Sequence, residues 1–261
     1  NRTAFITDPN QGYASARNNY EATIAAIGEF EAFGVDHELV AGIDFAYDVA
    51  LSPFYLQQEI GPIDIFNPVY DQPLGAITDV FDPSRDTSTN IGGYIQDQIT
   101  FSDQFILLLG GRIDSINQSR LDVLSDTRTN QNDVAFSPRV GLVYKPEEDI
   151  SLYGSFSQSI EQIIGNRLDD ETFEPSRGTQ YEIGAKADWL NGRLSTTLSL
   201  YDLTRSNVLT PDPRNINFSV QTGEQRSQGV ELNVAGEILP GWDVIAGYAY
   251  TDARVTEDNN I

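Results

Sequence analysis

The sequence predicts an all-β chain that forms part of an antiparallel transmembrane β-barrel. Three observations predict this fold class: apolar and polar residues alternate along many segments, short and long connections alternate between those segments, and no apolar stretch approaches the roughly 20 residues of a membrane-spanning helix. The longest apolar run covers only residues 105–109. A barrel strand turns only alternate residues toward lipid, so a β-barrel contains no long apolar run.

The alternation is clearest between Leu39 and Val49. The odd-numbered residues of this segment are all apolar or aromatic, whereas its even-numbered residues include Asp44 and Asp48. Successive side chains of a strand point to opposite faces, so this pattern predicts a strand with one apolar face. Similar alternation recurs in segments 20–30, 181–189, 230–234 and 242–250.

Ten strands are expected between about residues 18 and 253, at 18–30, 37–50, 90–101, 104–116, 135–145, 149–160, 179–190, 193–206, 217–236 and 241–253. The short connections fall near 31–36, 102–103, 146–148, 191–192 and 237–240, and the long ones at 51–89, 117–134, 161–178 and 207–216. Outer-membrane barrels have short periplasmic turns and long extracellular loops. We therefore predict that the long segments are extracellular loops and that residues 1–261 belong to one β-barrel domain.

Turn residues and aromatic residues support these boundaries. Asn191 and Gly192 both tolerate positive φ, as a tight hairpin turn requires. Segment 222–228 has no apolar face, which predicts a strand extension above the membrane, polar on both sides. Aromatic residues near strand ends are expected to form interfacial girdles; they are Tyr47, Trp189, Trp242, Tyr248 and Tyr250.

Charge and composition exclude several classes of protein. The chain carries 39 acidic and 16 basic residues, a net charge of −23, so a nucleic-acid-binding surface is not expected. The absence of cysteine excludes disulfides and cysteine-ligated metals. The chain has no methionine and no signal segment, and both of its ends are polar, so we expect an internal segment of a longer protein.

No residue pattern predicts catalysis, a metal site or a bound cofactor. His37 is the single histidine and is expected to be structural or solvated. The carboxylate runs 147–149 and 169–171 are typical of solvated loops. We therefore predict that the protein is not an enzyme.

Two long loops carry candidate ligand-binding residues. The first, 51–89, contributes Phe54, Tyr55, Phe66, Tyr70 and Phe81, and the second, 161–178, contributes Arg167 and Phe173. Aromatic side chains above a pore are natural contacts for a bulky ligand. The alternative is that these aromatic residues pack each loop on itself, because a loop this long needs a small core of its own.

Five segments in the range 88–256 resemble, in the same order, motifs of TonB-dependent siderophore receptors of the ferrichrome and aerobactin type. They are Gly93-Tyr-Ile-Gln-Asp-Gln98, Ser137-Pro-Arg-Val-Gly-Leu-Val-Tyr144, the segment from Phe173 to Lys186 with its Tyr-Glu-Ile-Gly core, the segment from Thr222 to Leu232, and the segment from Gly241 to Asp252. Residues 1–87 match this family only in general strand character.

The resemblance implies a bacterial outer-membrane barrel of 22 strands, about ten of them in this chain, around an N-terminal plug that lies outside it. It implies ferric siderophore as transported ligand, outer-membrane lipid around the barrel, and the TonB complex as the energy source through the plug region. On the resemblance, Glu182, Lys186 and Glu231 are expected to pair inside the lumen or with the plug.

Other readings of the same sequence remain open. A passive porin-type diffusion channel explains the strands and loops equally well, but it does not explain the five ordered motifs. A TonB-dependent receptor for another cargo, such as cobalamin or a glycan, fits both. An outer-membrane enzyme or adhesin barrel is the least supported, since the chain offers no nucleophile with a base beside it.

Overall fold

The structure is a computed structural model that describes residues 2–7, 16–52, 55–60, 66, 77–81, 83–163 and 172–259. For 2–7, 55–60, 77–81 and 216–217 it describes the backbone alone. Among the described residues, no helix is long and apolar enough to cross a membrane.

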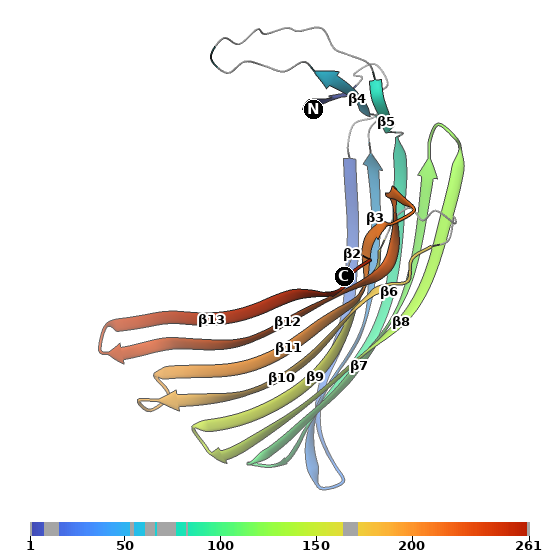
Figure 1. The fold of residues 1–261 in the computed structure, drawn as a ribbon. Coiled ribbons are helices and arrows are strands. Elements are labelled where there is room, and N and C mark those ends of the chain that lie inside the picture. The colour runs from blue at the N-terminus through green and yellow to red at the C-terminus, as the bar shows by residue number, and fades with distance from the viewer. Residues whose placement is uncertain are drawn as a thin grey trace. The chain divides into compact units, whose positions relative to one another are not determined.

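Ten strands form the main sheet in the order β13-β12-β11-β10-β9-β8-β7-β6-β3-β2, which Figure 1 shows side by side. Their bounds are β2 Ala16–Ala32, β3 Val35–Ser52, β6 Ser84–Ser102, β7 Phe105–Asp122, β8 Thr127–Glu147, β9 Ile150–Glu161, β10 Ser176–Trp189, β11 Leu194–Asp212, β12 Asn215–Leu239 and β13 Trp242–Glu257. Each of the ten expected strands is present, so the predicted all-β, antiparallel class is confirmed.

The strands run further than predicted at their long-loop ends. Of the expected loop 117–134, only 123–126 is a turn, and the expected loop 207–216 shrinks to 213–214, because β7, β8, β11 and β12 continue into them. Beyond the apolar band both faces of a strand are wet, so the alternation fades although backbone pairing continues. The predicted bounds of these two loops, 117–134 and 207–216, were therefore too wide.

The expected loop 51–89 contains strands that the sequence did not reveal. A second sheet of three strands has the order β1-β4-β5, with β1 at Arg2–Thr7, β4 at Tyr55–Ile60 and β5 at Ile77–Phe81. β1 pairs antiparallel with β4, and β4 pairs antiparallel with β5.

The short connections are tight turns, as predicted. Asn191 and Gly192 have φ of 59° and 79°, and Gly241 has φ of 77°. Phe33 and Gly34 form another such turn, with φ of 54° and 78°. Backbone in this left-handed region is inexpensive for glycine and tolerated by asparagine, so these residues end one strand and start the next.

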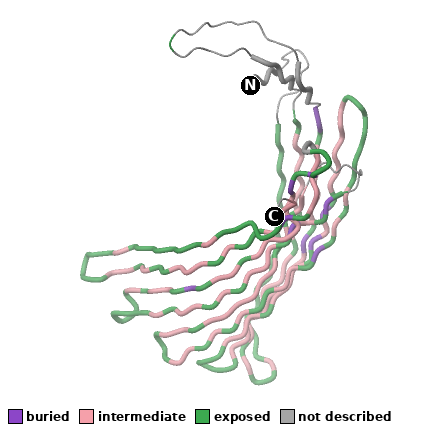
Figure 2. Tube along the Cα trace, viewed as in Figure 1, coloured by how far each residue is buried: buried purple, intermediate pink, exposed green. Residues whose placement is uncertain are grey.

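Few of the side chains that the structure describes on the main sheet are buried. Among the residues whose side chains are described, the buried hydrophobic ones are Ile116, Ala135 and Phe173, and Figure 2 shows that most positions are half-buried or exposed. Large apolar side chains stand exposed on one face of the sheet; Tyr181 and Ile183 are each 59% exposed. A single-layered sheet needs lipid on such a face.

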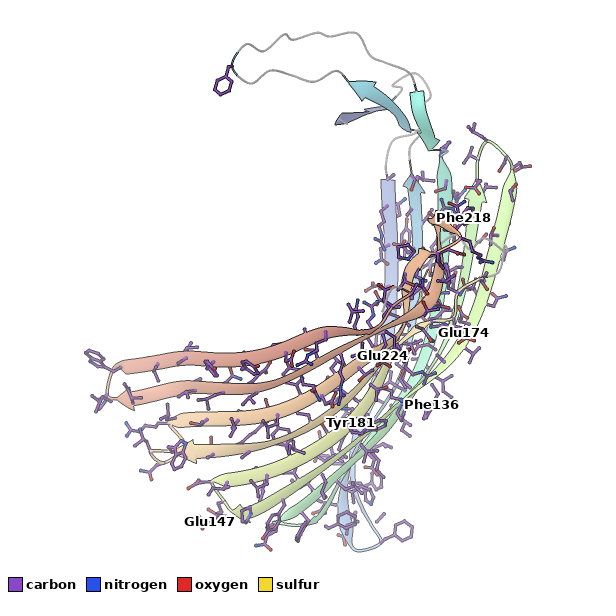
Figure 3. All side chains as sticks on the ribbon, viewed as in Figure 1. Phe136, Glu147, Glu174, Tyr181, Phe218 and Glu224 are labelled. Carbon is purple, nitrogen blue, oxygen red and sulfur yellow. The ribbon has the colours of Figure 1, made fainter. Side chains whose placement is uncertain are left out.

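Aromatic residues mark the two limits of this apolar face. Segments Tyr181–Trp189 of β10 and Trp242–Tyr250 of β13 each span nine residues from one aromatic residue to another. This length matches the roughly 9–11 residues with which a tilted strand crosses the hydrocarbon layer. Figure 3 shows the side chains standing on the strands, with Tyr181 labelled, and the Tyr181 ring lies 5.2 Å from that of Phe156 on β9.

Contacts divide the chain into two compact units. The first consists of residues 1–22, 44–91 and 116–132, and the second of 23–43, 92–115 and 133–261. The first contains the β1-β4-β5 sheet, and Arg17 pairs there with Asp48 at 2.8 Å. The second contains the residues around Glu182 and His37, whereas the predicted ligand-binding residues of segment 51–89 lie in the first. The expectation of a single domain over 1–261 stays a prediction.

Candidate functional site

Register places the polar residues of neighbouring strands in rows on one face of the main sheet. Glu182 of β10 lies between Ser155 of β9 and Tyr201 of β11, and Ser155 lies beside Gly141 of β8. The opposite face carries the exposed apolar side chains, such as Ile183 and Leu200. We call the polar side the lumen face and the apolar side the lipid face, since membrane barrels turn polar side chains inward.

A hydrogen-bonded cluster surrounds Glu182 on the lumen face. The Tyr153 hydroxyl donates to Glu182 Oε1 at 2.6 Å, and Gln180 Nε2 donates to Glu182 Oε2 at 3.0 Å. The Lys186 ammonium group lies 5.7 Å from the centre of the Tyr153 ring. Both carboxylate oxygens of Glu182 are therefore occupied within this chain. Glu182 and Lys186 were expected to pair in the lumen or with the plug, and both contact Tyr153 here. The expected contacts with the plug stay predictions.

Tyrosine rings lie over glycines of neighbouring strands at three places on the lumen face. A Cβ atom at Gly184 would stand 2.5 Å from the Tyr153 ring, and one at Gly42 would stand 2.5 Å from the Tyr94 hydroxyl. At Gly229 a Cβ would stand 2.6 Å from the hydroxyl of Tyr201. Each glycine thus leaves room for a tyrosine ring to lie against the strand backbone, so that the ring projects less into the lumen.

Next to this cluster, the lumen face is hollowed by about 540 Å³. Its lining includes Gln96, Arg112, Arg139, Ser155, Ser157 and Gln180. Register puts Arg139, Ser157 and Gln180 in one row across β8, β9 and β10. Arg112 is held by Asp114, with Nε at 2.8 Å from Oδ2 and Nη2 at 2.6 Å from Oδ1.

Beyond the aromatic limit of the apolar band, the lipid face becomes charged. Arg226 of β12 pairs with Asp202 of β11, and Gln228 Nε2 donates to Asp202 Oδ2 at 2.8 Å. Arg254 of β13 lies opposite Arg226 and pairs with Asp252. The segment 222–228 is part of β12, as predicted, and its place above the membrane stays a prediction.

The segment that leads into β10 is fixed to the β11–β12 hairpin. The backbone N–H of Glu174 donates to Gln221 Oε1 at 2.7 Å, and the Gln221 amide donates back to the carbonyl of Glu174. Asn207 Nδ2 donates to the Pro175 carbonyl at 3.2 Å. Phe173 is only 1% exposed, so it serves here as a packing residue and offers no surface to a ligand.

The other predicted ligand-binding residues are described in part. Phe66 is 91% exposed. Tyr55 and Phe81 are register partners in β4 and β5, so their backbones are brought together, although their side chains lie outside the described part. The remaining three predicted residues, Phe54, Tyr70 and Arg167, also lie outside the described residues.

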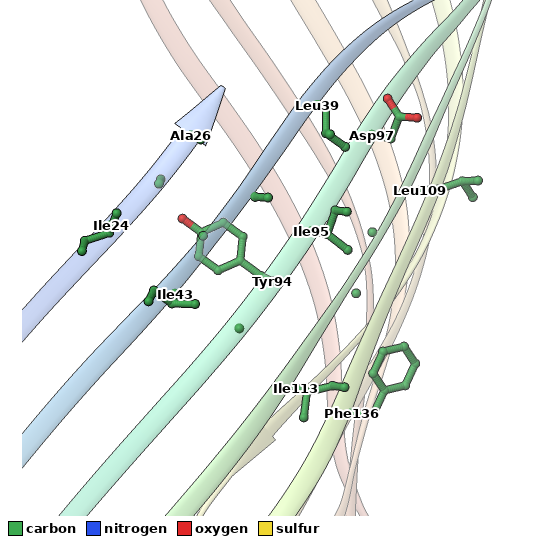
Figure 4. A pocket seen from close by; sticks show the side chains of 16 residues that line it. Ile24, Ala26, Leu39, Ile43, Tyr94, Ile95, Asp97, Leu109, Ile113 and Phe136 are labelled. Carbon is green, nitrogen blue, oxygen red and sulfur yellow. The ribbon is translucent and has the colours of Figure 1, made fainter. Parts of the chain in front are cut away.

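A larger hollow, of about 1120 Å³, lies over the lipid face of β2, β3, β6, β7 and β8 (Figure 4). Its lining includes small residues, among them Ala26, Ala41 and Gly111, and larger ones such as Ile113 and Phe136. The lining is almost entirely apolar. A hollow of this kind suits lipid acyl chains and is not a site for a polar cargo.

His37 lies at the short-turn end of the lipid face. Its Nδ1 atom is 2.8 Å from Asp97 Oδ2, and its ring stacks on Phe30 with centroids 4.9 Å apart. The sequence predicted a structural or solvated histidine, and these contacts favour the structural alternative. Among the side chains that the structure describes, no group of three or more histidine, cysteine or acidic residues is arranged to hold a metal.

Reasoning from sequence missed the residues of the lumen hollow. The signal was nonetheless present, because Tyr153, Ser155, Ser157 and Ser159 are alternate residues of one strand. Arg139 lies within the Ser-Pro-Arg motif, and only the register of β8 and β9 places it beside Ser157.

Comparisons with known proteins agree with this architecture. Residues 1–261 match the family described as TonB dependent receptor-like, beta-barrel, so the match extends through the first 87 residues. The metal-pseudopaline receptor CntO of Pseudomonas aeruginosa is 33% identical over 244 residues, which is 90% of this chain and 34% of that protein. The ferrichrome outer membrane transporter/phage receptor of Escherichia coli is 31% identical over 251 residues, covering 92% of this chain and 33% of that protein.

Solved structures share the fold. The siderophore receptor PiuA from Acinetobacter baumannii superposes with a TM-score of 0.76 at 20% identity, over 94% of this chain and 39% of that one. The ferripyoverdine receptor of Pseudomonas aeruginosa, bound to ferripyoverdine, gives 0.75 at 22% identity, over 95% of this chain and 34% of that one. The chain spans about a third of the length of the curated relatives that it matches. It belongs to the TonB-dependent receptor family of the outer membrane and forms part of the receptor β-barrel.

Proposed function

We propose that the full protein is an outer-membrane receptor that takes up a ferric siderophore with energy from the TonB complex. The observation that carries the proposal is the set of relatives, whose names include receptors for metal-pseudopaline, ferrichrome, ferrioxamine B and ferripyoverdine. The ordered motifs and the matched family support the same function. No covalent step is involved, so the protein is a transporter and not an enzyme.

The described residues fit such a role. The lumen face is lined by hydroxyl, amide and charged groups, which suit a hydrated, polar cargo. Phe66 presents an exposed aromatic ring in the predicted extracellular segment 51–89. The plug and its TonB contact belong to the part of the protein outside this chain, and they supply the energy for release.

Iron uptake in a receptor-deletion strain tests the proposal. The strain is complemented with the full-length gene, and initial uptake of radioactive iron is measured with ferrichrome, ferrioxamine B and ferripyoverdine. We expect uptake of at least one chelate, abolished by a protonophore. Uptake that persists without energy would support a passive porin instead, and growth restored only by cobalamin or a glycan would assign another cargo.

A pair of variants tests the predicted contact. Phe66→Ala is expected to raise the Kd for the transported chelate about tenfold, as loss of one aromatic contact implies. Phe33→Ala is the matched control, since Phe33 is also largely exposed but lies in a short turn of the predicted periplasmic end. Equal Kd values for both variants would remove Phe66 from the binding site.

A further inference from the structure

The β11–β12 hairpin contacts segments of two different connections at the long-loop end of the sheet. One is the neck of the connection between β9 and β10, where Glu161 ends β9 and Ser176 starts β10. The other is the segment 258–259, which follows β13. The hairpin and both segments belong to the same compact unit, so their contacts need no residue from the remainder of the barrel.

Arg205 of β11 holds the neck of the β9–β10 connection. Its Nε donates to the Ser176 hydroxyl at 3.0 Å, and its Nη2 forms an ion pair with Glu161. The Ser176 hydroxyl in turn donates to the carbonyl of Ser206 at 3.1 Å, and Ser176 is fully buried. One arginine side chain thus joins the residue that leaves β9 to the residue that enters β10.

The segment after β13 is held by a closed ring of hydrogen bonds. The Thr210 hydroxyl lies 3.0 Å from the Thr222 hydroxyl, which donates to Asn259 Oδ1 at 2.6 Å. Asn259 Nδ2 donates back to Thr210 at 2.6 Å and also to the carbonyl of Pro211 at 2.8 Å. A hydroxyl has one proton, so Thr210 is the donor to Thr222, and the three bonds run in one direction around the ring. Hydrogen bonds in such a chain polarise and strengthen one another.

Irregular register turns both sets of side chains out of the hairpin. Ser206 and Asn207 lie opposite a single residue of β12, and Thr222 has no register partner on β11. Asn207 has φ of 58°. A β-bulge redirects the side chains around it. Asn207 Nδ2 reaches the Pro175 carbonyl at 3.2 Å in this way, and Thr222 reaches Asn259.

Gln221 links the two sets of contacts. Its side-chain amide bonds to both backbone groups of Glu174 and to the carbonyl of Asn207, the last at 3.2 Å. The next residue of β12 is Thr222, which belongs to the hydrogen-bonded ring. Neither the contact to the β9–β10 connection nor the ring can therefore relax without moving the backbone of the other.

We propose that the β11–β12 hairpin is a clamp that joins two connections at the long-loop end into one cooperative unit. The clamp consists of Arg205, Asn207, Thr210, Gln221 and Thr222. The segment before β10 and the segment after β13 open together, so a ligand that binds to one of them changes the stability of the other. Such coupling is reciprocal by thermodynamic necessity. The proposal does not depend on which cargo the receptor transports.

Hydrogen exchange of the full-length receptor in lipid vesicles tests the coupling. Gln221→Ala removes contacts to Glu174, and exchange is followed at the end of β13, for which no contact with Gln221 is observed. Asn259→Ala opens the ring, and exchange is followed at the Glu174 amide, which Asn259 does not contact. Gln162→Ala is the matched control, because Gln162 lies at the same neck but donates to Asp133 of β8, at 3.1 Å. β8 lies on the side of β9 that faces away from the hairpin.

We expect each of the two clamp variants to speed exchange about tenfold in the distant segment, the order set by the loss of one or two hydrogen bonds. Gln162→Ala should leave both segments within twofold of wild type. If each variant speeds exchange only in the segment that it contacts, the two connections are independent and the proposal is overturned. Equal acceleration by the control variant would indicate general loosening of this end of the barrel and would overturn it as well.

A more conservative variant covers the case in which an alanine variant does not fold. Asn259→Asp keeps the size of the side chain and the acceptor for Thr222, but it removes both donors of the amide. Its folded gel mobility should be lost at the same temperature as that of wild type, while exchange of the Glu174 amide is still several times faster. Wild-type exchange of that amide in Asn259→Asp would contradict the clamp.

Discussion

The tyrosine ring that covers Gly184 makes this glycine sensitive to any larger side chain. In Gly184→Ala, the new Cβ would stand 2.5 Å from the Tyr153 ring, so the ring must retreat by about 0.9 Å, the difference between 2.5 and 3.4 Å, to restore ordinary contact. The Tyr153 hydroxyl lies 2.6 Å from Glu182 Oε1, and a shift of this size breaks that hydrogen bond.

Two costs then add. Overpacking costs about 1–3 kcal/mol, and a lost hydrogen bond to a charged group costs roughly 1.5–3 kcal/mol. Replacing glycine within a strand returns roughly 0.5–1 kcal/mol, because alanine loses less backbone entropy on folding. Together these three contributions predict that the free energy of unfolding of Gly184→Ala is about 3 kcal/mol lower than that of wild type.

Guanidinium unfolding of the full receptor in lipid vesicles measures this change. Gly141→Ala is the matched control: Gly141 lies on the same face, but its new Cβ would stand 3.6 Å from Leu108, which is ordinary contact. The reasoning is refuted if both alanine variants unfold alike. A further check is Gly184→Ala in a Tyr153→Ala background, where the clash is gone and the alanine should cost nothing.

Three other predictions concern the ends of the sheet. Phe173→Ala should lower protection of the β11–β12 hairpin from hydrogen exchange by about 3 kcal/mol, because it empties a buried site. The Arg214 guanidinium beside Asp212, outside the apolar band, lowers the pKa of that carboxyl below its usual 3.8. The hairpin tip should therefore keep this stabilisation above about pH 4 and lose it as the pH falls through the lowered pKa, which exchange measured from pH 6 to pH 3 would reveal. His37→Leu alone should destabilise the barrel more than His37→Leu with Asp97→Leu, since the single change leaves a carboxylate unpaired at the lipid face, and unfolding of both variants decides this.

The strands and their faces could be predicted because both follow from local chemistry. The period of two in 39–49 and 181–189 fixes which residues share a face, and the left-handed residues Asn191 and Gly192 fix a hairpin end. Lipid on one side and water on the other impose this alternation, so the signal disappears where both sides are wet. That is why β7, β8, β11 and β12 were predicted too short. β1, β4 and β5 are only 6, 6 and 5 residues long, too short for a period of two to be recognised.

The sequence by itself therefore determined the class of fold, the apolar band and the family. Only the tertiary structure decided which side chains meet across strands. Tyr153 and Glu182 are 29 residues apart, and they form a hydrogen bond because the register of β9 and β10 sets Tyr153 beside Gly184. The same register places Arg139 directly beside Ser157. Alternation assigns a residue to a face, but only strand register decides which residues are its neighbours.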